Sequence, residues 1–171
     1  MSTTFRIDRV EAALLALLNA NLPAAYGTEL GTGVVSMDID SLGDDDFNED
    51  GQLTLQPPSI RVRFIAGNYE NLRDSRRLTY QANPEFDILC FESSLRSKAD
   101  ERKQTLVLVG VVQDQLSGAR LDLADGSKTM PITLGPLALV ETDQGAVDQL
   151  FAQRITVEGI AQFSGANAQL P

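Results

Sequence analysis

The sequence predicts an α+β domain, in which a mainly antiparallel sheet carries two principal helices packed on it. One observation behind this prediction is the order of hydrophobic patterns: a helical period comes first, strand patterns follow, and a second helix and further strands complete the chain. The other is composition, since 43% of the 171 residues are hydrophobic and 22% are charged, as in ordinary globular domains. We therefore expect a single domain over residues 1–163 with an acidic loop at 43–51, followed by a flexible C-terminal tail at 164–171.

The first part of the chain predicts one helix and one strand. Apolar residues at three- and four-residue spacings indicate a helix over residues 6–22, and Pro23 is expected to end it. Apolar and polar residues then alternate from Val35 to Ile39, which predicts a strand. The acidic loop at 43–51 should connect this strand to the next one.

The middle of the chain predicts two more strands. Residues 59–66 alternate clearly, with the apolar side chains on one face and Arg61 on the other. A second, long strand is expected over residues 76–92, irregular at Asn83 and Pro84. Cys90 shares the apolar face of that strand, so we expect it to be packed rather than reactive.

The second helix is expected over residues 98–117. The run Leu106–Val112 is also typical of a buried strand, but the apolar residues around it follow helical spacing. Ser97 is a suitable N-cap and Gly118 a suitable C-cap, which favours the helix. Further strands are expected after this helix, at 130–134, 138–141 and 154–163.

Composition excludes several function classes. The formal net charge of −10 would repel nucleic acid phosphates. Histidine is absent, which removes histidine-based triads and zinc sites, and the single Cys90 cannot form a disulfide within the chain. No apolar run has the length of a membrane helix, the N-terminus does not resemble a signal peptide, and no phosphate-binding glycine motif is present. We expect no enzyme activity, no cofactor and no membrane contact.

The charges are unevenly distributed along the chain. Residues 1–58 contain ten acids and two bases, whereas residues 59–103 contain nine of the fourteen bases. An acidic and a basic region on one molecule can bind head-to-tail and close a ring, although a solvated surface with local ion pairs is the simpler interpretation. The residues we predict at a subunit interface are Arg73, Arg76, Arg77, Arg96, Asp44, Asp45 and Asp46.

One local motif suggests a metal. Asp46, Asn48 and Asp50 are spaced like the first three oxygen ligands of a calcium loop, and Gly51 follows at the expected place. However, Pro57 stands where a bidentate Glu should complete the coordination shell. The alternative is an acidic β-turn between two strands, which we prefer.

The order of segments resembles the tail terminator (tail completion) family of contractile-tailed, Mu-like bacteriophages. The resemblance covers about 160 residues and rests on patterns of apolar strands rather than on an invariant signature. The segments that carry it are the helix Ile7–Leu22, the strand Pro57–Phe64, the strand and basic loop Phe86–Arg96, the helix Ala99–Leu116, and the strands Leu137–Glu141 and Ile155–Phe163.

This resemblance implies a structural virion protein with a tail-terminator-like fold. Such a protein forms a ring, usually a hexamer, that caps the head-proximal end of the tail tube, ends tube and sheath growth, and meets a head-completion or neck protein. The resemblance also implies assembly in the host cytoplasm, with DNA passing through the ring without specific binding. Two alternatives stay open: another head–tail joining protein, and a calcium-binding module that uses residues 46–53.

Overall fold

The computed structural model describes residues 6–74, 77–93, 97–140 and 149–162. They form a six-stranded, mainly antiparallel sheet with strand order β1-β2-β3-β5-β4, in which β6 pairs with the far part of β3. Only the β1–β2 pair among these strands is parallel. The α+β prediction is thus confirmed. The strands are β1 Asp38–Ser41, β2 Ser59–Asp74, β3 Arg77–Phe91, β4 Thr133–Val140, β5 Leu150–Thr156 and β6 Gly159–Gln162.

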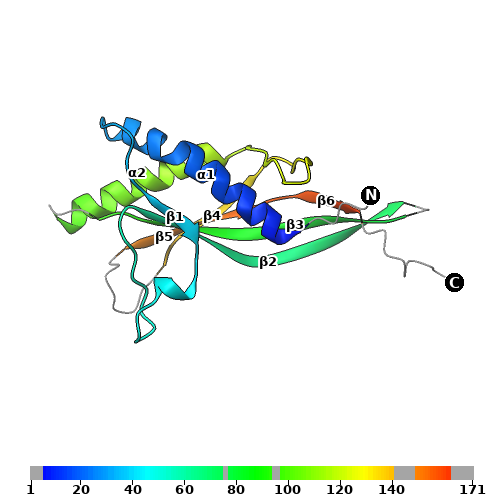
Figure 1. The fold of residues 1–171 in the computed structure, drawn as a ribbon, viewed down its shortest axis with the longest axis horizontal. Helices are drawn as coiled ribbons and strands as arrows, with labels where there is room; N and C mark the ends of the chain where they lie inside the picture. Colours follow the sequence, from blue (N-terminus) through cyan, green and yellow to red (C-terminus); the bar gives the residue numbers. More distant parts are fainter. Residues whose placement is uncertain (1–5, 75–76, 94–96, 141–148, 163–171) are drawn as a thin grey trace.

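Two helices, α1 (Ile7–Glu29) and α2 (Lys98–Leu116), lie side by side on one face of the sheet (Figure 1). Their apolar stripes point at the sheet because side chains three and four residues apart share one side of a helix. The main core lies between these layers and consists of fully buried aliphatic and aromatic side chains, among them Val10, Leu14, Leu18, Ile60, Val62, Phe86, Ile88, Leu108 and Val112.

Helix α1 is longer than predicted, because it continues through Pro23 to Glu29. Proline removes one helical N–H donor, yet the buried stripe runs on through Leu22 to Tyr26, and this burial stabilises the extra turns. The chain then crosses closely over Gly27, where an added Cβ would lie 1.9 Å from the carbonyl oxygen of Gly33. The prediction that Pro23 ends the helix was therefore wrong.

Helix α2 follows its prediction closely. The Ser97 side chain accepts a hydrogen bond from the Asp100 backbone N–H at 3.1 Å, which satisfies one of the free donors at the helix start. Gly118 follows the helix with a φ of +71°, the left-handed conformation that glycine adopts readily. The strand alternative for Leu106–Val112 is excluded.

The strands differ from their predicted bounds in physically clear ways. Strand β1 begins at Asp38 rather than at Val35. The Val35 N–H donates to the Pro23 carbonyl oxygen and not to a neighbouring strand. The strand expected at 59–66 continues to Asp74, since it pairs with β3 along its whole length past a bulge between Phe64 and Ala66.

The long strand was predicted to be irregular at Asn83 and Pro84, but the change at this point is in the strands that pair with it. Strand β3 runs without a break through Pro84 and stays paired with β2 on one side. On its other side, the paired strand changes near Pro84 from β5 to β6. The strand expected at 154–163 is accordingly divided: β5 begins earlier, at Leu150, and ends at Thr156, and the Val157 N–H then donates to the Pro84 carbonyl. Conversely, the two strands expected at 130–134 and 138–141 form one strand, β4, with a register shift between Leu134 and Leu137.

The sheet face opposite the helices is covered over part of its area by the segment between β1 and β2. A second, smaller core lies there, formed by Leu55, Leu89, Phe91, Leu150 and Ala152, with Leu42, Leu53 and Val140 packed against it. In Figure 1 this segment, drawn in cyan, hangs below the sheet while both helices lie above it. The acidic loop is therefore carried on the side of the sheet away from the helices.

Candidate functional site

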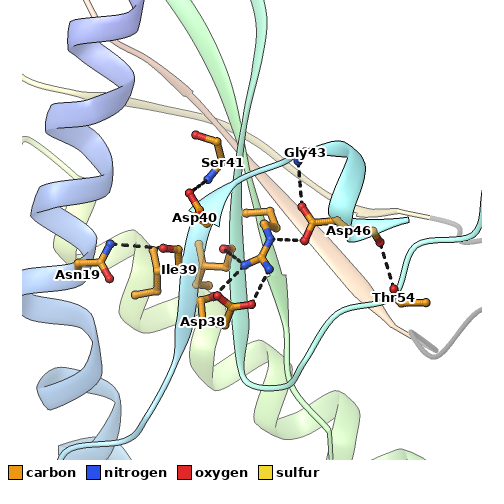
Figure 2. A network of polar contacts seen from close by, with 10 residues as sticks. Asn19, Asp38, Ile39, Asp40, Ser41, Gly43, Asp46 and Thr54 are labelled. Carbon is orange, nitrogen blue, oxygen red and sulfur yellow. Dashed lines mark hydrogen bonds and ion pairs between the residues drawn. The ribbon is translucent and has the colours of Figure 1, made fainter. Parts of the chain in front are cut away.

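A buried arginine anchors the acidic loop to the sheet. Arg61 lies on β2 with 7% of its surface exposed, and its Nε donates to Asp46 Oδ1 at 2.7 Å. Its Nη2 donates to Asp38 Oδ2 at 2.5 Å, and its Nη1 to the backbone carbonyl oxygens of Asp38 and Ile60. Figure 2 shows the two carboxylates reaching this guanidinium from β1 and from the loop. One side chain thus ties together β1, β2 and the start of the loop.

The Arg61 network compensates the buried charge of the arginine. Burial by itself would lower the pKa of Arg61, but the hydrogen bonds and charges of Asp38 and Asp46 outweigh burial and raise it. A buried charge of this kind is tolerated only when partners satisfy it, and removing one partner is costly. Asp46 is accordingly a structural residue of this chain.

The side-chain oxygens of Asp46 and Asn48, two residues of the calcium-like motif, accept hydrogen bonds within the chain. The second carboxylate oxygen of Asp46 accepts from the Gly43 N–H at 2.9 Å. The side-chain oxygen of Asn48 accepts from the backbone N–H groups of Asp50 and Gln52, which is the geometry of an Asx turn. Over the described ranges, no group of three or more acidic or cysteine side chains is placed to hold a metal ion. The geometry present here is that of a closed polar turn.

The outer part of this loop faces solvent. Asp44, Asp45, Glu49 and Asp50 are exposed, and Phe47 among them is 41% exposed. The loop holds its shape through the one-turn helix Asp44–Asp46 and a backbone bridge between Phe47 and Leu53. Because its base is anchored by Arg61 and the small core, the loop presents an aromatic ring and several acids in a defined arrangement. We call residues 44–50 the acidic loop tip.

Of the basic residues predicted at an interface, Arg73 and Arg77 do not lie near the acidic loop tip. Arg73 and Arg77 occupy the far end of the β2–β3 hairpin, where Asp74 pairs with Arg77. Figure 1 shows that end extending beyond the helices, at the opposite end of the molecule from the cyan loop. Arg76 and Arg96 fall outside the described residues. The structure therefore separates Arg73 and Arg77 from the acidic loop tip within one chain.

A second ion cluster lies on the sheet face opposite the helices. Asp87, 3% exposed, accepts from Arg63 Nη2 at 2.8 Å and from Arg154 Nε at 3.0 Å. Burial alone would raise the pKa of Asp87, but the hydrogen bonds from Arg154 and Arg63 outweigh it and lower the pKa. The three residues join the adjacent strands β2, β3 and β5.

Sequence reasoning missed an exposed apolar surface beside strand β4. Leu106 of α2 is 41% exposed, and Leu137 and Leu139 of β4 are 41% and 55% exposed. The register places Leu137 opposite Gln153 and Leu139 opposite Phe151. Since Phe151 belongs to the helix-side core and Gln153 accepts from Gln113 of α2, both leucines project on the helix side of the sheet.

The same side of α2 is basic near its N-terminus. A shallow hollow runs along the helix and is lined by Ala99, Arg102, Lys103, Leu106 and Val107. Leu106 lies two helical turns before Gln113, so it points to the same side, toward β4 and β5. We call Arg102, Lys103, Leu106, Leu137 and Leu139 the α2–β4 surface. The signal in the sequence was the run Pro136–Val140, a strand without any polar alternation.

Cys90 is packed, as predicted. It is fully buried in the main core, and this burial raises the pKa of its thiol to about 12. A thiol in this state is not a nucleophile.

Among the described residues, no helix is both long and apolar enough to cross a membrane.

Comparison with known proteins shows similarity at the level of fold. No protein-family model matches the sequence, and no curated protein matches it. The structure is similar to that of a chain from the virion of a native gene transfer agent particle, with a TM-score of 0.50 and 11% sequence identity. The similarity covers 91% of this chain and 96% of the other chain. At this identity the comparison shows that the two chains share a fold across nearly their whole lengths.

Proposed function

We propose that this chain is a structural virion protein that caps the head-proximal end of a phage tail tube as a ring. In this role it ends tail growth and joins the tail to the head. The observation that carries the proposal is the shared fold with a virion chain, which extends over 91% of this chain and 96% of the other. The order of segments, which resembles the tail terminator family of contractile-tailed phages, gives the more specific role.

The structure supports a role in assembly rather than in catalysis. The ion networks on the buried Arg61 and on the buried Asp87 are closed by partners within the chain. The exposed features of its described residues include an acidic loop tip with an aromatic ring and an apolar surface with basic residues. Exposed apolar patches of this kind mark protein contacts. The net charge of −10 suits a ring through which DNA passes without being held.

A second candidate is another head–tail joining protein. The shared fold with a virion chain favours it equally, because that likeness does not specify a position along the particle. The two candidates differ in the structure to which they bind. A terminator binds the open end of the tail tube, whereas a joining protein of the head binds the connector.

The experiment is a growth assay with purified tail-tube subunits. Tubes that polymerise from this subunit without a terminator should keep elongating, and adding this chain should arrest them and cap one end in electron micrographs. Binding to isolated head connectors with no effect on tube growth would favour the second candidate. Binding to neither structure would overturn the proposal that this is a head–tail virion protein.

A further inference from the structure

We infer that the acidic loop tip of one copy docks onto the α2–β4 surface of a second copy. This inference rests on the proposed function, since it names the contact that would build the ring. It changes the basic residues predicted at the contact from Arg73, Arg76, Arg77 and Arg96 to Arg102 and Lys103 of α2.

The acidic loop tip is an ordered ligand. Asp46 is fixed by Arg61 and by the Gly43 N–H, and Leu53 and Leu55 on the return path pack into the second core. From this base the tip exposes Phe47, flanked by the solvent-facing Asp44 and Asp45. A preorganised tip loses little conformational entropy on binding, and a solvent-facing phenyl ring is an effective anchor when a pocket covers it.

The receiving surface has the complementary character. Leu106, Leu137 and Leu139 supply exposed apolar area, and the hollow along α2 offers a depression beside them. Arg102 and Lys103 line that hollow, and within the described part of the chain neither forms an ion pair. The tip thus offers an aromatic ring with nearby acids, and the receiving surface offers leucines with nearby bases. The two surfaces are complementary both in apolar character and in charge.

The two surfaces cannot meet within one copy. The loop hangs on the sheet face away from the helices, whereas the α2–β4 surface lies on the helix side at the β4 edge (Figure 1). A contact between different patches of identical chains is heterologous, and repeated around an axis it closes a ring. Pro136 and the register shift in β4 oppose strand pairing at this edge, so we expect docking through side chains.

A charge exchange between two variants tests this contact. In R102E/K103E the α2–β4 surface becomes acidic, and in D44K/D45K the loop tip becomes basic, so each variant alone should repel its own copies. We expect the dissociation constant for self-association to rise by about tenfold or more in each variant, as two reversed exposed pairs allow. Mixing the two variants restores opposite charges at every contact, so the mixture should assemble as the wild type does.

Matched controls separate the outcomes. R120E, after the end of α2, and E70K, on the far part of the β2–β3 hairpin, reverse exposed charges away from both surfaces and should assemble normally. Thermal melting of every variant checks its folding. A wild type that self-associates, with unchanged variants, would overturn this contact and leave the proposed function in place. A mixture that fails to recover although both variants are folded would also overturn it. A wild type that stays monomeric in solution and forms no ring on purified tail tubes would overturn it as well. The proposed function is tested independently by arrest of tube growth.

Discussion

At the scale of single residues, Arg61 decides where the acidic loop lies. The alternating pattern of residues 59–66 correctly separated Arg61 from the apolar face, but it did not reveal that the second face is also covered. The covering segment comes from between β1 and β2, and its position depends on the pairing of Arg61 with Asp38 and Asp46. Such a contact joins residues 15 and 23 positions apart, and no local pattern encodes it.

Asp46→Ala should destabilise the protein. It leaves the buried guanidinium of Arg61 with one carboxylate instead of two and removes the acceptor of the Gly43 N–H. We expect the free energy of unfolding to fall by about 2–3 kcal/mol, measured by urea denaturation. Asp50→Ala, at an exposed position of the same loop, is the control and should change stability by about 0.5 kcal/mol or less. Equal effects of the two substitutions would contradict the anchoring role.

Calcium should not bind the acidic loop. Both carboxylate oxygens of Asp46 and the side-chain oxygen of Asn48 already accept hydrogen bonds within the chain. We therefore expect the melting temperature to be the same with and without millimolar calcium. A calcium-dependent rise that Asp50→Ala abolishes would show instead that the loop is a metal site.

Asp87 should make stability depend on acid pH. Its pKa is lowered in the folded protein, so its contribution is complete above the pKa of the unfolded chain, about 4, and is lost as the pH falls through the folded value. Asp87→Asn should therefore be less stable than the wild type at neutral pH, and the difference should shrink below pH of about 4. Asp114→Asn, at an exposed helix position, should track the wild type at every pH. Urea titrations at several pH values measure this, and a constant difference would contradict it.

At the scale of elements, local signals located the helices better than the strands. Helix α2 was predictable because the cap residue, the apolar spacing and the closing glycine agree. The end of α1 was not, since the local effect of Pro23 is outweighed by burial of Leu22 and Tyr26 against the rest of the fold. The bounds of β5 and β6 depend on their pairing with β3, which lies about 70 residues earlier in the chain.

Ser97→Ala tests the start of α2. The serine oxygen accepts from the Asp100 N–H, and its loss leaves that donor to water. We expect a fall of about 1 kcal/mol in the free energy of unfolding. Ser117→Ala, at the other end of the same helix, is the matched control and should have a much smaller effect. Thermal or urea unfolding of both variants gives the comparison, and equal losses would show that the cap is not the cause.

At the scale of the whole molecule, the sheet separates two complementary surfaces. The acidic loop tip lies on one side of it and the α2–β4 surface on the other. The uneven charge of the sequence allows a head-to-tail contact, but Arg102 and Lys103 were not among the basic residues predicted for it from the sequence. Exposure and side are properties of the fold, and they favour Arg102 and Lys103, which lie beside exposed leucines.

The assembly state in solution tests the proposed ring. We would measure the molar mass by light scattering across a concentration series and image any large species by negative-stain electron microscopy. We expect a closed ring of about six copies, built from one repeated heterologous contact. A chain that is monomeric at every concentration and forms no ring on purified tail tubes would contradict it.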